Sequence, residues 1–278
     1  LCGLGAGNFS SSMANISFSS PQRLQGTALG LNAGVGNLGV GLAQLVTPIA
    51  VYGGALLVLG GEAQTLGDGS DTRIWLQNAG FIWVPFIVAA AVAAWFGMDN
   101  IATVKAGFAE QVAIFRHKHQ WLMSWLYTGT FGSFIGLAAS FPMLVNTEFP
   151  GVDAFKFAFI GPLLAALVRP IGGWLADQRG GARITFWSFA VMAAAPVAAI
   201  PCLPSATSDG SVVAFVLLFL ILFIAAGVGN GSTFRMIPTI FRSLREQQAV
   251  GQGDAALAQA RRDGVTEAVA TLGFSSVV

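Results

Sequence analysis

The stretch "VVAFVLLFLILFIAAGVGNGSTFRMIPTIF", residues 212–241, carries no charged side chain before Arg235. A helix needs about 20 apolar residues to cross the hydrocarbon core of a bilayer, and this stretch supplies them without interruption. The rest of the chain is similar in character. Of its 278 residues, 54% are hydrophobic and only 10% are charged, whereas roughly 25% are charged in an ordinary soluble domain. These features predict an all-α membrane protein.

Seven other stretches contain few or no charged residues, and most of them reach the length of a membrane span. They are residues 1–18, 27–59, 79–98, 121–146, 154–176, 183–204 and 264–278. Residues 1–18 lack the basic start of a signal peptide and continue into further spans. The first and last stretches are short. We therefore expect about eight spans and interpret the sequence as an internal fragment of a larger membrane protein.

The charged residues between these stretches orient the protein. If the spans alternate in direction, ten Lys and Arg residues fall on one side, and only Arg73 and Lys156 fall on the other. The ten are Arg23, Lys105, Arg116, Lys118, Arg179, Arg183, Arg242, Arg245, Arg261 and Arg262. Cytoplasmic loops carry an excess of Lys and Arg. The pattern predicts a multi-pass protein of the inner (cytoplasmic) membrane, with the basic side in the cytoplasm.

One cytoplasmic connector, "MDNIATVKAGFAEQVAIFRHKHQ" at residues 98–120, is more polar than the others. A linker between two groups of helices is the layout of many transporters built from two half-repeats. We therefore expect residues 1–98 to complete a first helical bundle. Residues 99–120 are then the linker between bundles, and residues 121–278 belong to a second bundle.

An arginine interrupts the apolar segment "LAALVRPIGGWL", residues 164–175. Insertion scales place the cost of such a residue at the membrane centre at about 2.5 to 3.5 kcal/mol, so a buried Arg169 indicates a functional site. Pro170 cannot donate a backbone hydrogen bond to the preceding turn, and it predicts a kink beside the arginine. Gly172 and Gly173 follow, so we expect this helix to bend there.

A second segment, "QGTALGLNAGVGNLGVGLAQL" at residues 25–45, is rich in glycine at four-residue spacing. Such spacing strips one helix face of side chains, so that either another helix or a ligand can approach the backbone. Asparagines add amide donors to this surface. The residues concerned are Gly26, Gly30, Gly34, Asn32 and Asn37. Close packing and ligand binding both fit the glycines.

Two resemblances carry a more specific prediction. The segment "GGWLADQRGGAR", residues 172–183, resembles the cytoplasmic loop motif of the major facilitator superfamily. The glycine-rich run 26–38, "LYTGTFGSFIGLAASFPML" at 126–144 and "LGFSS" at 272–276 resemble the nitrate/nitrite porter family (NarK-type transporters) of that superfamily. The resemblance covers the whole chain and numbers its spans four to eleven of twelve. Ala33 departs from the family pattern, which commonly has glycine there.

The resemblance implies a partial major facilitator fold and transport of nitrate and nitrite by alternating access. Arg169 would be one of two arginines that clamp the anion, its partner belonging to a span that this sequence does not contain. Tyr127 would hydrogen-bond near the substrate or its arginine, and Phe9 and Phe131 would sandwich the planar anion. The remaining substrate contacts would come from Asn37, Asn32, Gly26, Gly30 and Gly34. Gating contacts would come from Pro170, Gly172, Gly173, Asp177, Arg179 and Arg183.

The mode of transport is a further prediction. All thirteen acidic residues fall in loops or near span ends, whereas proton-driven transporters usually keep a titratable group inside the membrane. We therefore expect nitrate/nitrite exchange. Proton-coupled nitrate uptake is the alternative, and an anion channel or receptor of similar topology is a further one.

Other expectations follow from the same residues. We expect no enzymatic activity, because both histidines, His117 and His119, lie in the linker rather than within a span. A solvated face accounts for them, so we expect no metal and no other cofactor. The net charge of +1 gives no sign of a nucleic-acid partner, and we expect a monomer in the lipid bilayer. Arg235 lies near a cytoplasmic span end, and we expect its side chain to extend to the interface.

Overall fold

The computed structural model describes residues 9, 12, 13, 15, 16, 20–53, 61–65, 71–97, 114–205 and 209–275. Helices dominate this part of the chain. They are α2 (Gln25–Gly53), α3 (Asn78–Phe81), α4 (Val84–Gly97), α6 (Lys118–Tyr127), α7 (Ser133–Glu148), α8 (Ile160–Arg179), α9 (Gly181–Ala199), α10 (Val212–Gln248) and α11 (Asp254–Ser275).

Short elements connect these helices. Single 3-10 turns lie at Gln22–Leu24, Ile114–Arg116, Ala154–Lys156 and Ile200–Cys202. A π-helical turn, η3 (Thr128–Gly132), joins α6 directly to α7. Strands β1 (Gln64–Thr65) and β2 (Arg73–Ile74) form a small antiparallel pair in which Gln64 lies opposite Ile74.

Within the described residues, six helical segments are long and apolar enough to cross a membrane. They are Gln25–Gly53, Asn78–Gly97, Lys118–Glu148, Ala154–Arg179, Gly181–Cys202 and Val212–Gln248. Six of the predicted spans are thus confirmed. Most of the predicted span 1–18 and the linker residues 99–113 lie outside the described residues. The predicted span 264–278 falls at the end of α11, whose earlier turns carry several charged residues.

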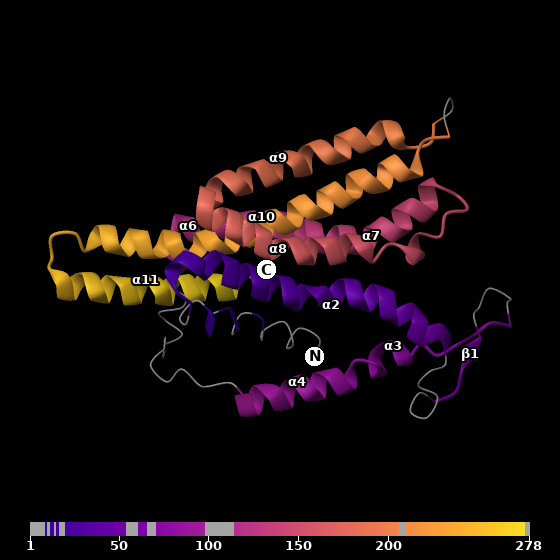
Figure 1. Ribbon diagram of the computed structural model, residues 1–278, viewed down its shortest axis with the longest axis horizontal. Coiled ribbons are helices and arrows are strands. Elements are labelled where there is room, and N and C mark those ends of the chain that lie inside the picture. Colours follow the sequence, from indigo (N-terminus) through magenta and orange to yellow (C-terminus); the bar gives the residue numbers. More distant parts are fainter. Residues whose placement is uncertain are drawn as a thin grey trace.

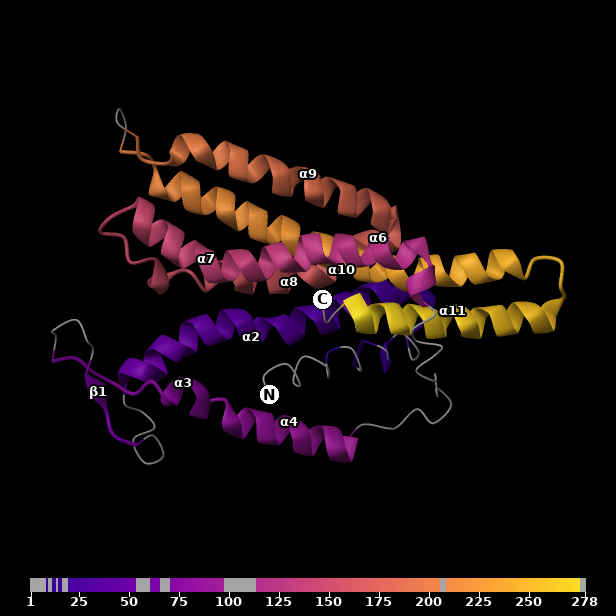
Figure 2. The same cartoon turned by 180° about the vertical axis from the view of Figure 1, so that it is seen from behind.

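Helix α8 lies between α2 and α10, and α10 also packs against α9 and α11 (Figures 1 and 2). The hairpin of α10 and α11 projects at one end of the molecule, while the α7–α8 and α9–α10 loops lie at the opposite end. At 37 residues, α10 is about 55 Å long, so it extends well beyond a hydrocarbon core of roughly 30 Å. Its last turns, which carry Arg242 and Arg245, lie at the end of the helix that the basic residues predict to be cytoplasmic.

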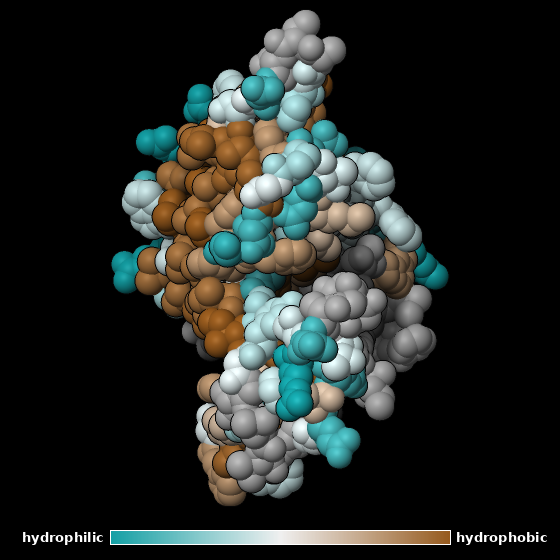
Figure 3. All heavy atoms as spheres, turned by 90° about the vertical axis from the view of Figure 1, so that its right-hand side faces the viewer, coloured by the Kyte–Doolittle hydropathy of each residue, from teal (hydrophilic) through white to brown (hydrophobic). Residues whose placement is uncertain are grey.

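Apolar side chains face outward as well as inward. Trp95 and Phe96 of α4 are each 83% exposed, and none of the residues of α4 is buried. Viewed along the long axis, a broad hydrophobic surface covers one flank of the molecule, and hydrophilic residues follow the loops (Figure 3). Lipid chains are the solvent in which such a surface is stable.

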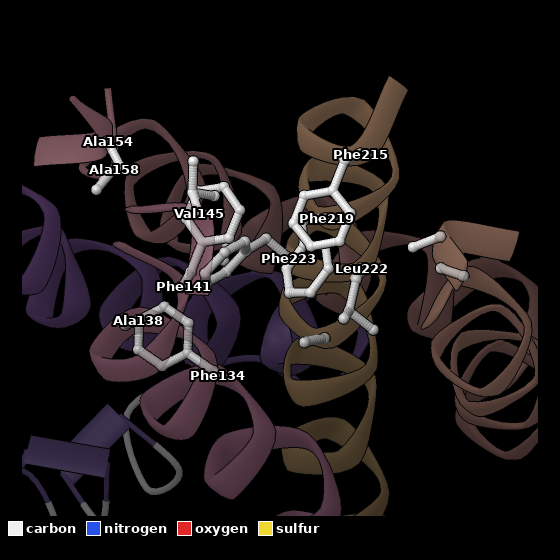
Figure 4. Packing of buried hydrophobic residues seen from close by; sticks show 14 of the residues in the cluster. Phe134, Ala138, Phe141, Val145, Ala154, Ala158, Phe215, Phe219, Leu222 and Phe223 are labelled. Atoms are coloured by element: carbon white, nitrogen blue, oxygen red, sulfur yellow. The ribbon is translucent and has the colours of Figure 1, made fainter. Parts of the chain in front are cut away.

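The inward-facing core between α7 and α10 is aromatic. Phe141 stacks on Phe219 with ring centroids 5.1 Å apart and meets Phe223 edge-on at 6.1 Å (Figure 4). Phe215 lies against Phe219 one turn earlier in α10, at 4.6 Å. These ring contacts fix α10 against α7 on the side of the membrane opposite to the α10–α11 hairpin.

The regular glycines of α2 bring its backbone against α8. A Cβ atom on Gly30 would lie 2.8 Å from the Arg169 carbonyl oxygen, and one on Gly34 would lie 2.7 Å from the Ala166 oxygen. Both distances are too short for real contacts, so only glycine permits this approach. The glycine spacing thus has a packing role next to Arg169, and direct substrate contact by Gly26, Gly30 and Gly34 remains a prediction.

We expect Gly30→Ala to lower the melting temperature of the complete protein in detergent, because overpacking costs about 1–3 kcal/mol. Gly39→Ala in the same helix is the matched control, since an added Cβ there meets nothing within 4 Å. Thermal unfolding followed by circular dichroism measures both. Equal melting temperatures for the two variants would contradict the packing role of Gly30.

Candidate functional site

Arg169 is the centre of the candidate site, and its side chain is fully buried in the middle of α8. Its Nη1 donates to the backbone oxygen of Ala33 in α2 over 3.4 Å. The guanidinium carbon lies 4.6 Å from the ring centre of Phe134 and 5.5 Å from that of Phe131. Within the described part of the chain, no carboxylate pairs with Arg169. Its positive charge is therefore stabilised by ring faces and one carbonyl dipole.

Several buried polar atoms around Arg169 lack partners among the described residues. They are Nε and Nη2 of Arg169, the hydroxyl of Tyr127 and Oδ1 of Asn230. Tyr127 comes from the end of α6 and Asn230 from the middle of α10, and the Tyr127 hydroxyl interacts electrostatically with Arg169. Leaving such a group unpaired costs about 1–3 kcal/mol, and more for a charged group. This arrangement favours a bound polar ligand.

Aromatic rings line one side of this group. Tyr127 and Phe131 stack at 5.1 Å with 20° between their planes, and Tyr127 also contacts Phe234 at 5.1 Å. Phe9 contacts Phe234 at 5.9 Å. Of the predicted aromatic residues, the structure thus brings Tyr127 and Phe131 to Arg169, while Phe9 and Tyr127 both contact the ring of Phe234. A sandwich of the substrate between Phe9 and Phe131 remains a prediction.

The two predicted asparagines of α2 have different surroundings. Asn37 donates to the Ala33 oxygen over 2.7 Å, which is the same carbonyl that accepts from Arg169. Asn37 therefore lies beside the arginine. Asn32 instead donates to the Ser12 hydroxyl over 3.0 Å and contacts the sulfur of Met13. Asn32 thus connects α2 to the segment that precedes it, and its predicted contact with substrate is not tested.

Helix α8 passes through Pro170 without a break. Pro170 lies against Gly30 and Gly34 of α2, where the missing side chains make room for its ring. Gly172 packs on the backbone of Val228 in α10, and Gly173 packs on that of Gly26 in α2. The glycine pair therefore holds α8 close to both neighbours. The predicted bending of α8 at this point remains a prediction.

Asp177, in the last turn of α8, joins three helices. Its carboxylate accepts hydrogen bonds from the backbone N–H groups of Gly26 (3.2 Å) and Thr27 (3.0 Å) in the first turn of α2, and from the Thr27 hydroxyl (3.1 Å). It also forms an ion pair with Arg235 of α10. The start of a helix carries unpaired N–H groups and positive partial charge, so a carboxylate is stabilised there.

The ion pair of Asp177 with Arg235 shows that the prediction for Arg235 was wrong, and it involves neither Arg179 nor Arg183. Arg235 was expected to extend to the membrane interface, but its side chain is only 19% exposed and folds onto Asp177. Arg179 and Arg183, predicted to share gating contacts with Asp177, are exposed and form no ion pair with any residue that the structure describes.

His117 of the linker lies 3.5 Å from Glu267 of α11, so the end of the linker contacts the α10–α11 hairpin.

The sequence profile of the Major Facilitator Superfamily matches residues 1–257. The chain belongs to the major facilitator superfamily. Its members are membrane transporters, and the fold predicted from the cytoplasmic loop motif is thereby confirmed. The chain is a multi-pass protein of the cytoplasmic membrane, as the distribution of basic residues predicted.

Individual members of the superfamily are similar to this chain over most of its length. It is 44% identical over 278 residues to the "Nitrate/nitrite transporter NarU" of Escherichia coli, covering all of this chain and 59% of the relative. It is 43% identical over 250 residues to the "Probable nitrate/nitrite antiporter NarK2" of Thermus thermophilus, covering 87% of this chain and 55% of the relative. It is 25% identical over 246 residues to the "Nitrite extrusion protein" of Bacillus subtilis, covering 86% of this chain and 54% of the relative. The chain thus spans less than two thirds of the length of these relatives.

Several residues of the candidate site were not predicted from the sequence. Asn230 and Phe234 in α10, Phe134 in α7 and Thr130 in η3 all lie around Arg169 or Tyr127. One signal was available in the sequence for Asn230, since it is an amide within an otherwise apolar and small-residue stretch of a predicted span. The aromatic residues gave none, because phenylalanine is frequent throughout this chain.

Proposed function

We propose that the complete protein carries nitrate and nitrite across the cytoplasmic membrane by alternating access, as a monomer, and that it is a transporter rather than an enzyme. The observation that supports this most directly is the burial of Arg169 without a carboxylate among its described contacts. A buried cation with unpartnered N–H groups favours an anion as ligand. The names of the similar transporters support nitrate and nitrite as that anion.

The chemistry of the site fits a small planar anion. A guanidinium presents two parallel N–H donors in one plane, and an anion with oxygens in a plane accepts both. Nη2 and Nε of Arg169 are a neighbouring pair of this kind, and both are without partners among the described residues. The ring of Phe131, which stacks on Tyr127, offers a flat apolar surface next to this pair. A spherical or tetrahedral anion would use this surface less well.

We further propose that transport is an exchange of nitrate for nitrite. Among the described residues, no Asp, Glu or His lies in contact with Arg169 to take up a proton. An empty carrier with a permanent positive charge should reorient slowly, whereas an anion bound at Arg169 offsets the charge. Conformational equilibria shift only as far as the ligand binds the two states differently. Binding of the anion itself therefore shifts the equilibrium between the access states, as protonation does in a symporter.

Asp177 is the residue through which we propose that the cytoplasmic side opens and closes. It connects the start of α2, the end of α8 and the cytoplasmic half of α10 through directional contacts. When α8 separates from α2, these contacts must break together. Gly172 and Gly173 lie one turn before Asp177 and allow the close approach that the contacts need.

Counterflow tests the proposal. Proteoliposomes of the complete protein are loaded with a high concentration of unlabelled nitrate, and a trace of labelled nitrate is added outside. A carrier accumulates label transiently above its equilibrium level, and we expect this result with nitrate and with nitrite. A channel equilibrates the label without overshoot. An absence of label uptake with both anions would contradict the proposed transport.

A further inference from the structure

Helix α2 forms hydrogen bonds at three levels with the helices that follow the linker. Thr27 in its first turn donates to Asp177 of α8. The Ala33 oxygen accepts from Arg169, and Gln44 donates to α7. At about 1.5 Å per residue, Ala33 lies roughly 9 Å from Thr27 and roughly 16 Å from Gln44 along the helix axis. The candidate anion site therefore lies between two contacts that join the same helix to its neighbours.

The contact of Gln44 is a single directed hydrogen bond. Helix α2 runs toward the end of the molecule that carries the α7–α8 and α9–α10 loops (Figure 1), and Gln44 lies in its second half. Its Nε2 donates to the backbone oxygen of Ala138 in α7 over 2.7 Å. The amide cannot be turned around, because its oxygen would then face another oxygen. Its Oε1 is buried and has no partner among the described residues, so the bond to Ala138 is what favours an amide at this position.

Pro142 explains why the Ala138 oxygen needs a donor from another helix. In an α-helix, each backbone oxygen accepts from the N–H four residues later, and four residues after Ala138 stands Pro142, which has no N–H. Ala138 is buried beside Phe134 and Phe141 of the aromatic core (Figure 4). An unpaired carbonyl is costly at such a position. Gln44 supplies the donor that the proline lacks.

We propose that the hydrogen bond from Gln44 to the Ala138 oxygen is a latch that closes the anion site at the end opposite to Asp177. Helix α2 belongs to the predicted first bundle and α7 to the predicted second, and alternating access moves one bundle against the other. The latch must therefore break whenever this end opens, while the contacts of Asp177 stay intact. This role rests on the proposed function, because a carrier needs a separate closure on each side of its site.

The energetics of one uncharged hydrogen bond suit a contact that forms and breaks in every cycle. When this end opens, water enters and pairs with both the amide and the carbonyl, so the net free energy lost is small. Removing the donor is more harmful in the closed state, where the dry carbonyl is left unpaired. Loss of the Gln44 N–H therefore destabilises the closed state selectively and shifts the protein toward opening at this end.

Thiol labelling tests the latch in the purified complete protein, with its native cysteines replaced by serine. Val40, one turn before Gln44, packs against the aromatic core and reports opening at this end when it is replaced by cysteine. We expect Gln44→Met to raise the rate at which a water-soluble maleimide labels position 40 by about fivefold, since methionine keeps the length of the side chain and loses the donor. Asp177→Asn should lower this rate, because it favours opening at the other end.

Pro142→Ala separates the hydrogen bond from simple packing. Alanine at position 142 supplies the N–H that the Ala138 oxygen lacks. In this background, we expect Gln44→Met to change the labelling rate by less than about twofold, since the carbonyl stays paired without Gln44. Gln120→Met is the matched control, because this buried glutamine donates to Ser124 of its own helix and should leave labelling unchanged.

Three results would overturn the latch while leaving nitrate transport intact. They are equal labelling of Gln44→Met and the parent protein, an undiminished effect of Gln44→Met in the Pro142→Ala background, and faster labelling in Asp177→Asn as well, which would indicate general loosening. A parent protein that shows no counterflow with nitrate or with nitrite would instead overturn the proposed function, and the latch with it.

Discussion

Arg169→Lys is expected to lower the nitrate affinity of the complete protein by about 10- to 100-fold, since a charge-assisted hydrogen bond contributes about 1.5–3 kcal/mol. Lysine keeps the charge but replaces the planar pair of donors by a single ammonium group. The guanidinium can donate to the Ala33 oxygen and to a planar anion at the same time. The ammonium cannot reproduce this geometry. Calorimetric titration with nitrate measures the loss, and labelled uptake should fall in parallel.

Two other arginines serve as controls for this substitution. Arg183→Lys changes an exposed residue at the start of α9 and should leave affinity unchanged. Arg235→Lys should also retain most of the affinity, because an ammonium can still pair with Asp177. If correctly inserted Arg169→Lys protein binds nitrate like the wild type, Arg169 does not hold the anion.

Asp177→Asn is expected to reduce the maximal exchange rate by about tenfold or more, because it removes the charge that holds Arg235 and weakens the bonds to the start of α2. The side chain of Asp177 is 8% exposed, so water replaces these contacts poorly while the helices remain packed. Hydrogen–deuterium exchange of the backbone amides measures the loss of these contacts. The amide protons of Gly26 and Thr27 donate to Asp177 and should exchange faster in the variant.

A matched control for this variant is Asp209→Asn, which neutralises an exposed acid in the α9–α10 loop at the other end of the molecule. It should change neither the exchange rate nor the protection of α2. Unchanged transport in Asp177→Asn, together with unchanged protection at Gly26 and Thr27, would show that this carboxylate does not control the cytoplasmic side.

The spans could be predicted from sequence because the signal is local. Each of the six confirmed segments contains its own run of apolar residues, and a bilayer requires about 20 of them whatever the neighbouring helices do. Arg169 could be singled out for a similar reason. A cation in the middle of such a run costs free energy in the bilayer, so its presence there indicates a function. This cost follows from the local sequence and does not depend on which helices pack against the residue.

The contacts of the site could not be predicted, because they join residues that are distant in sequence. Asn230 meets Thr130 across 100 positions, and Arg235 meets Asp177 across 58. No periodicity reports such a pairing. The π-helical turn at Thr128–Gly132 is also invisible in sequence, since its residues fit a continuous α-helix equally well. Yet this turn brings Thr130 toward Asn230.

The glycines of α2 show a different limit. Their four-residue spacing indicated a bare helix face, which the structure contains, but spacing alone could not decide between a neighbouring helix and a ligand. The backbone of α8 occupies this face at Gly30 and Gly34. Whether a helix or a ligand occupies this face depends on the shape of α8, whose Pro170 and Ala166 fit the space that the glycines leave.

The most direct test of this account is exchange in proteoliposomes of the complete protein. One set of vesicles is loaded with nitrite and another is empty, and labelled nitrate is added outside with and without an imposed pH gradient. We predict rapid uptake into nitrite-loaded vesicles regardless of the gradient, and little uptake into empty ones. Uptake that requires the pH gradient and ignores internal nitrite would contradict exchange at a permanently charged Arg169.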